Sequence, residues 1–461
     1  MAILGAYMVP HPPMIVPDIG RGREKEIEET IRAYEKVAED IAKIKPETII
    51  ITSPHSVMYS DYFHISPGKK AGGSFINFGA GNVSFKEGYD EELVNILNGL
   101  AYKSDFPAGS LGEKDKNLDH GTMVPLWFIR NHYKGGKIVR IGLSGLPLTE
   151  HYKFGMMIQE AINMTDRRCV FVASGDLSHK LKDYGPYGFA KEGPIYDERI
   201  MDISERGAFD EMLDFDETFC DKAAECGHRS FVIMAGALDG VELEIDRLSH
   251  EDVTGVGYGI CIFHPKGPDN RRHFLDIYME KLKKRVEAER EKEDQYVKLA
   301  RASLESYIKY GKVLSIPEGL PPDMIRNRAG VFVSIHKHGN LRGCIGTIGP
   351  TEPSIAQEII QNAISASTRD PRFDPITEDE LDLLEINVDV LGQAESVKSM
   401  DELDVKKYGV IVSCGSRRGL LLPDLEGVDT VEEQVSIAMR KGRINKGEKI
   451  KLERFEVIRH I

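Results

Sequence analysis

Residues 48–56, TIIITSPHS, combine a short β-branched strand with a loop that starts at the strand's end and contains His55. The stretches ILGAYMVPHPP, residues 3–13, and CVFVASGDLSH, residues 169–179, repeat this arrangement. Between the first two of these strands, residues 21–44 place apolar side chains at helical spacing and carry heavy charge on the other face. Alternating buried strands and amphipathic helices predict an α/β sheet with helices on both faces for the first half of the chain.

A different pattern begins after the first 266 residues. We therefore divide the chain into a first domain, residues 1–266, a charged helical linker, residues 267–292, and a second domain, residues 293–461. The charge run KLKKRVEAEREKEDQ, residues 281–295, starts in this linker and extends just past it, and its density predicts a solvated helix. Apolar spacing through Ile308 predicts that this helix continues into the second domain.

The second domain has the sequence pattern of an α+β fold. Its strand-like stretches are AGVFVSIHKHG, LRGCIGTIG, LEINVDVLG, YGVIVSCG and RGLLLPD. Helical segments at residues 353–367 and 430–441 interleave with them. Short strands in close succession, with few helices between them, favour an antiparallel sheet.

The composition is that of an ordinary folded chain with an acidic balance. The 461 residues are 41% hydrophobic and carry a net charge of −14, which disfavours nucleic acid and anionic membranes as partners. No apolar window has the length of a membrane helix and the N-terminus lacks a signal-peptide pattern, so we expect a cytoplasmic protein. Six scattered cysteines exclude a disulfide framework and a zinc ribbon.

Four histidines in the first domain lie in loops next to predicted strands or helices. They are His11, His55, His120 in NLDHGTMVPLWF, and His179, which follows Asp176 by three residues. Ligands of open α/β sheets collect at the carboxyl ends of the strands. We therefore expect at least three of these histidines to share one site, the alternative being that each is a solvated loop residue.

The stretch DKAAECGHRSFVIMAGAL, residues 221–238, supplies two further candidate ligands at the start of a predicted buried helix. Either Glu225 or Cys226 could complete a metal site with two histidines. Two histidines and one carboxylate form the facial triad of non-haem Fe(II) enzymes, whereas a thiolate favours zinc or alters the redox potential of iron. The alternative for Cys226 is a buried thiol without a ligand role.

The motifs PHPP, SPH, DHG, SGDLSH and ECGHRS, in this order, resemble the class III extradiol ring-cleavage dioxygenases of the LigB type, and more closely their Memo-like branch. The resemblance covers roughly residues 1–266. It implies that His11 and His55 hold Fe(II). The third ligand is a glutamate in the dioxygenases and a cysteine in the Memo-like branch, where its counterpart is Cys226. The cysteine puts catechol cleavage itself in question.

The same resemblance assigns an acid–base role to one histidine. The Asp-x-x-His pair of the Memo-like branch matches Asp176 and His179, and the dioxygenase acid–base histidine also falls on His179. His120 is a second candidate, which would hydrogen-bond the substrate or bound oxygen. We expect Asp176 to accept a ring N–H from His179 and to raise the pKa of that imidazole.

LRGCIGTIGP, residues 341–350, is unusually rich in glycine, and an extended backbone would put Arg342 and Cys344 on one face. A cysteine beside a cation can be nucleophilic, the alternative being a structural cysteine in a buried strand. This stretch and those that follow it resemble the AMMECR1 family from about residue 293 to 461. We expect a working cleft lined by Arg342, Cys344, Arg369, Asp370 and Arg372.

Two function classes follow from these observations. The first is an oxidoreductase of the extradiol dioxygenase type that uses Fe(II), with zinc as the alternative metal, to act on a small dihydroxy-aromatic or similar chelating substrate and O2. The pairing of the two domains also resembles a microbial system that includes a radical S-adenosylmethionine enzyme, which implies such a partner protein. The second class is a non-catalytic metal- or peptide-binding scaffold. Homo-oligomerisation stays open.

Overall fold

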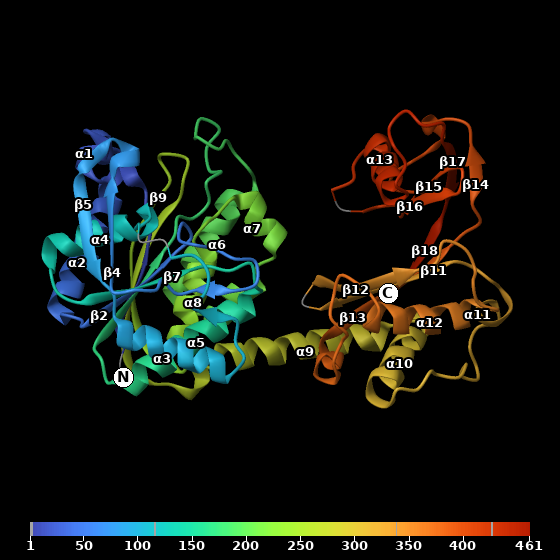
Figure 1. The fold of residues 1–461 in the computed structure, drawn as a ribbon, viewed down its shortest axis with the longest axis horizontal. Helices are drawn as coiled ribbons and strands as arrows, with labels where there is room; N and C mark the ends of the chain where they lie inside the picture. The colour runs from blue at the N-terminus through green and yellow to red at the C-terminus, as the bar shows by residue number, and fades with distance from the viewer. Residues whose placement is uncertain (1–2, 115–116, 338, 426) are drawn as a thin grey trace. The chain divides into compact units, whose positions relative to one another are not determined.

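The computed structural model describes residues 3–114, 117–337, 339–425 and 427–461. The chain forms two compact units, residues 1–279 and 280–461, which are described separately below (Figure 1). Helix α9, Phe274–Lys292, contains the division between them. The predicted fold class is confirmed, an α/β unit followed by an α+β unit, although His338 of the predicted AGVFVSIHKHG strand lies outside the described residues.

The first unit is built on a six-stranded mixed sheet. Four neighbouring strands, β7, β2, β8 and β1, run parallel, and β10 and β9 extend the sheet antiparallel at one edge. In sheet order the strands are β7 (Lys137–Gly142), β2 (Thr48–Ser53), β8 (Cys169–Ser174), β1 (Ile3–Val9), β10 (Tyr258–Pro268) and β9 (Val241–Glu251).

Helices cover both faces of this sheet, which is why β2 and β8 are buried along their whole length. Helices α2 (Glu28–Ile44) and α4 (His120–His132) pack on each other and share a core cluster with alternate residues of β1, β2 and β8. Helix α8 (His228–Ala237) packs on β8 and on α5 (Leu148–Thr165). The remaining elements are α1 (Pro17–Gly20), β3 (Phe63–His64), β4 (Lys70–Phe75), β5 (Ala80–Gly88), α3 (Glu91–Lys103), β6 (Ala108–Gly109), α6 (Glu192–Arg206) and α7 (Glu217–Ala223).

The charged segment differs from its prediction in two ways. Helix α9 ends at Lys292, and α10 (Gln295–Tyr310) begins separately because the Asp294 side chain caps its first backbone N–H groups, so the predicted continuous helix is wrong. Four apolar residues of α9, spaced four apart, are also buried, so the helix is not solvated all round. They are Phe274, Tyr278, Leu282 and Val286.

None of the helices within the described ranges has the apolar length that a membrane crossing requires.

The second unit contains two four-stranded antiparallel sheets, as predicted from its short strands. The first has the order β12 (Asn340–Gly346), β11 (Val331–Lys337), β13 (Leu384–Leu391) and β18 (Val457–His460). The second has the order β14 (Glu395–Val397), β17 (Lys451–Phe455), β15 (Gly409–Cys414) and β16 (Arg417–Leu421). Helices α10 and α12 (Ile355–Thr368) pack on the first sheet and α13 (Val431–Lys441) on the second, while α11 (Pro322–Arg326) contacts α12.

Candidate metal centre

The parallel strands of the first unit deliver the predicted site residues to one edge of the sheet. His11 follows the end of β1, and His55 follows the end of β2. Asp176 follows the end of β8, which lies between those two strands. Because parallel neighbours end at the same edge, side chains distant in sequence meet there.

Cys226 reaches this edge because two glycines let backbones touch. A Cβ atom on Gly175 would lie 2.0 Å from the Cα atom of Gly227, so any side chain there would push the two loops apart. Two hydrogen bonds donated by backbone N–H groups hold the loops in place. The Cys226 N–H donates to the Asp176 carbonyl oxygen at 3.3 Å, and the Asp176 N–H donates to the Cys226 sulfur at 3.3 Å.

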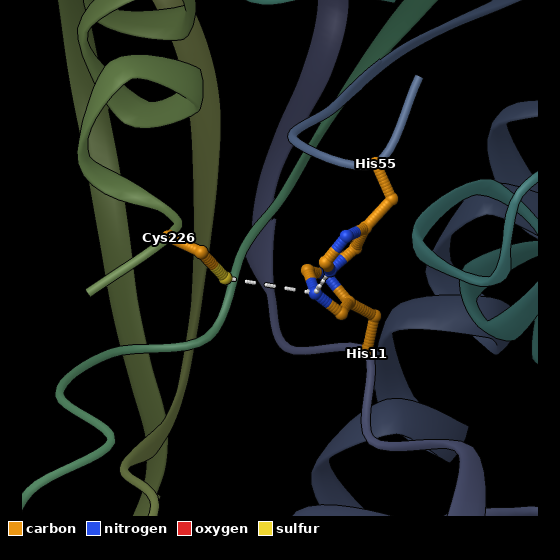
Figure 2. A group of neighbouring side chains, drawn as sticks. All are labelled: His11, His55 and Cys226. Atoms are coloured by element: carbon orange, nitrogen blue, oxygen red, sulfur yellow. Dashed lines mark hydrogen bonds between the residues drawn. The ribbon is translucent and has the colours of Figure 1, made fainter. Parts of the chain in front are cut away.

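The three candidate ligands converge (Figure 2). The Nε2 atoms of His11 and His55 are 3.0 Å apart, and the Cys226 sulfur lies 3.6 Å from His11 Nε2. One donor atom from each residue lies within 4.8 Å of the other two. Bonds of about 2.0–2.3 Å from nitrogen and sulfur to a metal ion are compatible with this spacing. The group could therefore hold one metal ion.

The ring orientation of His11 is fixed by Ser174. The Ser174 hydroxyl donates its only hydrogen to the Gly121 carbonyl oxygen at 2.6 Å, so toward His11 it acts as an acceptor. His11 Nδ1 lies 2.9 Å from that oxygen and must carry the proton. Nε2 is then left with a free lone pair that points to His55 and Cys226, as a metal ligand requires.

The imidazoles of His11, His55 and His120 are uncharged at neutral pH. Burial, with the neighbouring histidine His55, lowers the pKa of His11 to about 3. Burial also lowers the pKa of His55, although Asp119 and Asp176 oppose the change. For His120, burial and the two other rings lower the pKa to about 4. Neutral imidazole is the form that binds metal ions.

The sulfur and the neighbouring carboxylate of the ECG segment point in different directions. Glu225 Oε2 accepts the backbone N–H of His228 at 2.6 Å at the start of α8, and burial raises its pKa to about 7. Cys226 instead faces the two histidines. Burial, and then the charges of Asp176 and Glu225, raise the pKa of the Cys226 thiol. A metal ion would therefore have to displace a proton from this sulfur.

His120 lies beside the three converging side chains without belonging to them. It begins α4, which the Asp119 side chain caps by accepting the Thr122 N–H at 2.9 Å. The His120 ring is 4.0 Å from the His55 ring and 5.4 Å from the His11 ring, between centroids. On its other side it contacts the ring of Phe78, also at 5.4 Å.

The predicted hydrogen bond between Asp176 and His179 is wrong. Asp176 Oδ1 accepts the backbone N–H of His11 at 2.7 Å, so this carboxylate braces the loop of a candidate ligand. His179 Nδ1 is buried and has no hydrogen-bond partner within the described part of the chain. The ring of Tyr187 packs edge-on against the His179 ring at 5.2 Å. His179 is thus oriented by packing and keeps an unused polar atom.

In the second unit, the predicted alternation of Arg342 and Cys344 is wrong because β12 has a bulge. Ile335 pairs with Gly343 and the next residue of β11 pairs with Leu341, so Arg342 is the extra residue. Arg342 binds the buried Glu380 through two nitrogens at 3.0 and 2.9 Å.

The other residues of the predicted cleft do not lie together either. The backbone N–H of Cys344 donates to Asp370 Oδ2 at 2.9 Å, and Arg372 donates to the Cys344 carbonyl oxygen at 3.1 Å. Arg369 ends α12 as its C-terminal cap. Neither Arg342 nor Arg369 lines the cavity that Cys344 lines, so the cleft is not the one predicted.

Three side chains at the metal centre were not among the predicted site residues. Ser174 lies inside CVFVASGDLSH, but its role depends on a carbonyl oxygen of another segment. Phe78 ends a short 3-10 helix, Ile76–Phe78, and Tyr187 lies in a turn, and neither carries a sequence signal that distinguishes it from other exposed aromatic residues.

Comparisons with family models and with relatives in sequence agree with this architecture. Residues 5–261 match the model of the catalytic LigB subunit of aromatic ring-opening dioxygenase, and residues 297–460 match the AMMECR1 model. Protein CA_C1420 of Clostridium acetobutylicum is 42% identical over 469 residues, which cover 100% of this chain and 99% of that protein. A protein of Thermotoga maritima is 52% identical over 170 residues, 36% of this chain and 98% of its own length. Among solved structures, the uncharacterized protein PH0010 from Pyrococcus horikoshii is 31% identical with a TM-score of 0.34, covering 36% of this chain and 88% of that chain.

Proposed function

Since the chain belongs to the family of the catalytic LigB subunit of aromatic ring-opening dioxygenases and also carries an AMMECR1 domain, we propose that its first unit is a metal-dependent oxidoreductase. We further propose that the metal is Fe(II), with zinc as the alternative. The substrate would be a small dihydroxy-aromatic or similar chelating molecule that reacts with O2. The observation that carries the proposal is the convergence of His11, His55 and Cys226 on one point.

The donor set fits a metal ion in its chemistry. Two uncharged imidazoles and one sulfur offer soft and borderline ligands, which suit Fe(II) and Zn(II) better than Mg2+ or Ca2+. His11 has only one tautomer open to it, and that tautomer leaves Nε2 free. Three protein ligands leave coordination positions for other molecules. Ferrous iron bound there would supply the redox chemistry with O2 that ring cleavage needs.

The residues around this metal centre have separate tasks in the proposed reaction. Among the described residues nothing hydrogen-bonds to the half-buried ring of His179, so this ring could take a hydroxyl proton from the substrate and return it later. His120, with a pKa of about 4, is uncharged and would hydrogen-bond the substrate. Asp176 holds the His11 loop through its backbone N–H.

Two exposed aromatic side chains flank this edge. Phe78 contacts His120 and Tyr187 contacts His179, each ring-to-ring, and both remain at least one-third exposed, at 38% and 61%. Aromatic rings pack favourably edge-on or offset against other aromatic rings. This arrangement supports an aromatic substrate rather than a sugar or a phosphate ester.

Metal analysis of anaerobically purified protein tests the proposal. We expect about one iron per chain in the wild type and loss of that iron in His11→Ala and His55→Ala. His132→Ala, a partly exposed histidine on α4 that pairs with Glu35, is the matched control and should keep the metal. If the wild-type protein is folded but contains no iron and binds no added Fe(II), the proposal that the first unit is an iron-dependent oxidoreductase is refuted.

A scaffold remains the second candidate, because Cys226 stands where the dioxygenases have a glutamate. A thiolate changes the redox properties of iron and favours zinc. Protein that holds one zinc per chain, and that consumes no O2 with a catechol after reconstitution with Fe(II), would support the scaffold instead.

We also propose that the chain acts with a radical S-adenosylmethionine enzyme in one modification pathway. This part rests on the pairing of a LigB-type domain with an AMMECR1 domain in one chain. Affinity purification from the native organism under anaerobic conditions tests it, and recovery of the chain without any such enzyme would count against it.

A further inference from the structure

A cavity of about 630 Å³ lies between the two sheets of the second unit. One wall consists of residues from β11, β12, β13 and β18. The other consists of β16, the chain just after it, and the last residue of α13. A volume of this size is typical of small-molecule sites in proteins.

Part of the cavity lining is polar, and several of its groups are unused. Ser334 donates to the Cys344 sulfur at 3.3 Å, and both residues line the cavity. His336 and Asn387 also line it, and neither side chain forms a hydrogen bond with a residue in the described ranges. Burial lowers the pKa of His336, so its ring is uncharged at neutral pH. These groups can each bond to a ligand.

The charges around the cavity leave one cation uncompensated. Arg459 pairs with Asp389 at 2.8 Å, and Arg418 pairs with Glu453 at 3.0 Å. Lys441 also lines the cavity, and no ion pair or hydrogen bond joins it to any residue that the structure describes. The lining therefore favours a ligand with a single negative charge.

The rest of the lining is apolar. The side chains that form it come from both walls and from the segment that follows β16. They are Phe332, Leu341, Ile348, Leu420, Leu421, Leu422 and Leu425. A wholly charged ligand such as phosphate would leave this surface uncovered, whereas a molecule with an apolar body would bury it.

We propose that this cavity binds a small organic monoanion, a carboxylate or sulfonate with an apolar body. Its charged group pairs with Lys441, its apolar body lies against the leucines, and Cys344 is covered when it binds. The site belongs to the second unit alone, so it does not depend on the metal centre or on the oxidoreductase activity.

The test uses 8-anilinonaphthalene-1-sulfonate, a monoanion with an apolar body, as the probe on the full chain. Iodoacetamide alkylation of each cysteine is followed by peptide mass spectrometry at increasing probe concentration. Cys414, also half-buried, does not line the cavity and serves as the internal control. We expect saturable protection of Cys344, by about tenfold or more in rate, with Cys414 unchanged.

Two comparisons test whether the negative charge of the ligand and the positive charge of Lys441 contribute to binding. N-phenyl-1-naphthylamine has the same rings without the sulfonate. Its concentration at half-maximal protection of Cys344 should be about tenfold higher than that of the sulfonate. Lys441→Met should weaken protection by the sulfonate about tenfold, whereas Lys446→Met, an exposed lysine outside the cavity, should not.

Several outcomes would overturn the proposal. Cys344 alkylation that the sulfonate does not slow would show that the cavity does not take such a molecule. Equal protection by the charged and uncharged probes would show that no anion is selected. Because both probe measurements use the wild-type chain, the result does not depend on whether the Lys441→Met variant folds.

Discussion

Ser174 and His11 are joined by a hydrogen bond of 2.9 Å that determines which nitrogen of the His11 ring faces the neighbouring sulfur and imidazole. The bond has only one direction, because the serine hydrogen is already given to the Gly121 carbonyl oxygen. A residue in the last position of a central strand thus prepares a candidate metal ligand in the loop that follows the adjacent strand.

Ser174→Ala should weaken metal binding without unfolding the protein. Loss of the acceptor for Nδ1 frees the ring to change tautomer and orientation, and such outer-shell changes cost about 10–100-fold in metal affinity. Isothermal titration with Zn2+ under reducing conditions measures it. Ser249→Ala removes another buried serine hydroxyl in the same sheet, one that bonds to none of the residues in the described ranges, and should leave the affinity unchanged. Equal affinities of Ser174→Ala and wild type would contradict the assigned role.

His179→Ala should separate proton transfer from metal binding. Loss of a general acid–base lowers turnover by about 10²–10⁴-fold, while the metal content stays near that of the wild type. His11→Ala should lose the metal itself. Metal analysis and O2 uptake with 3,4-dihydroxybenzoate, compared for both variants, provide the measurement. If His179→Ala loses as much metal as His11→Ala, the ring of His179 belongs to the coordination shell and the acid–base remains unassigned.

Glu380 should make the second unit sensitive to acid. Burial alone would raise its pKa, but hydrogen bonds from Arg342 and Lys337 outweigh burial and lower it from 4.5 to about 2. A lowered folded-state pKa contributes stability that is complete above the unfolded value of 4.5 and disappears as the pH falls to about 2. The contribution at neutral pH is on the order of 2–3 kcal/mol.

Glu380→Gln should therefore lower the free energy of unfolding at neutral pH and flatten its decrease between pH 4.5 and 2. Urea unfolding of the full chain at several pH values, with hydrogen exchange of β11 and β12 to assign the transition, gives the comparison. Glu378→Gln, an exposed carboxylate two residues away, should follow the wild-type curve. Parallel curves for wild type and Glu380→Gln would show that Glu380 does not couple to unfolding.

The first unit should need residues beyond the predicted boundary at 266. Strand β10 continues to Pro268, and the buried Asp239 accepts the backbone N–H of Phe274 at 3.0 Å and contacts His273 Nδ1 at 2.8 Å. A fragment of residues 1–266 leaves Asp239 with the Tyr152 hydroxyl but without these two partners, which costs about 1–3 kcal/mol of unfolding free energy. Thermal melting of fragments 1–266 and 1–279 compares the two. A fragment 1–266 as stable as 1–279 would show that these contacts add little.

The edge of the sheet that carries the site could be predicted, because the position of each loop histidine depends on the local sequence pattern. A β-branched or apolar run followed by a loop histidine places His11 and His55 at strand ends, and neighbouring parallel strands bring those ends together. The choice between Glu225 and Cys226 could not be settled in this way. Adjacent residues point in different directions, and their orientation depends on the contact between Gly175 and Gly227.

The same limit explains the two errors about side-chain direction. Regular alternation put Arg342 beside Cys344, but one bulge in β12 moves Arg342 off that face. The three-residue spacing of Asp176 and His179 suggested a hydrogen bond, but the carboxylate is taken by the backbone of His11. Bulges and competition for an acceptor arise from tertiary contacts, which sequence spacing does not report.

The central claim is that two imidazoles and the Cys226 sulfur bind one metal ion, and X-ray absorption at the metal edge tests it most directly. Protein reconstituted with one Zn2+ per chain should show one sulfur at about 2.3 Å and nitrogens at about 2.0–2.1 Å. Cys226→Ser should lose the sulfur contribution and keep the nitrogens. A wild-type spectrum with nitrogen and oxygen neighbours only, identical to that of Cys226→Ser, would contradict the account.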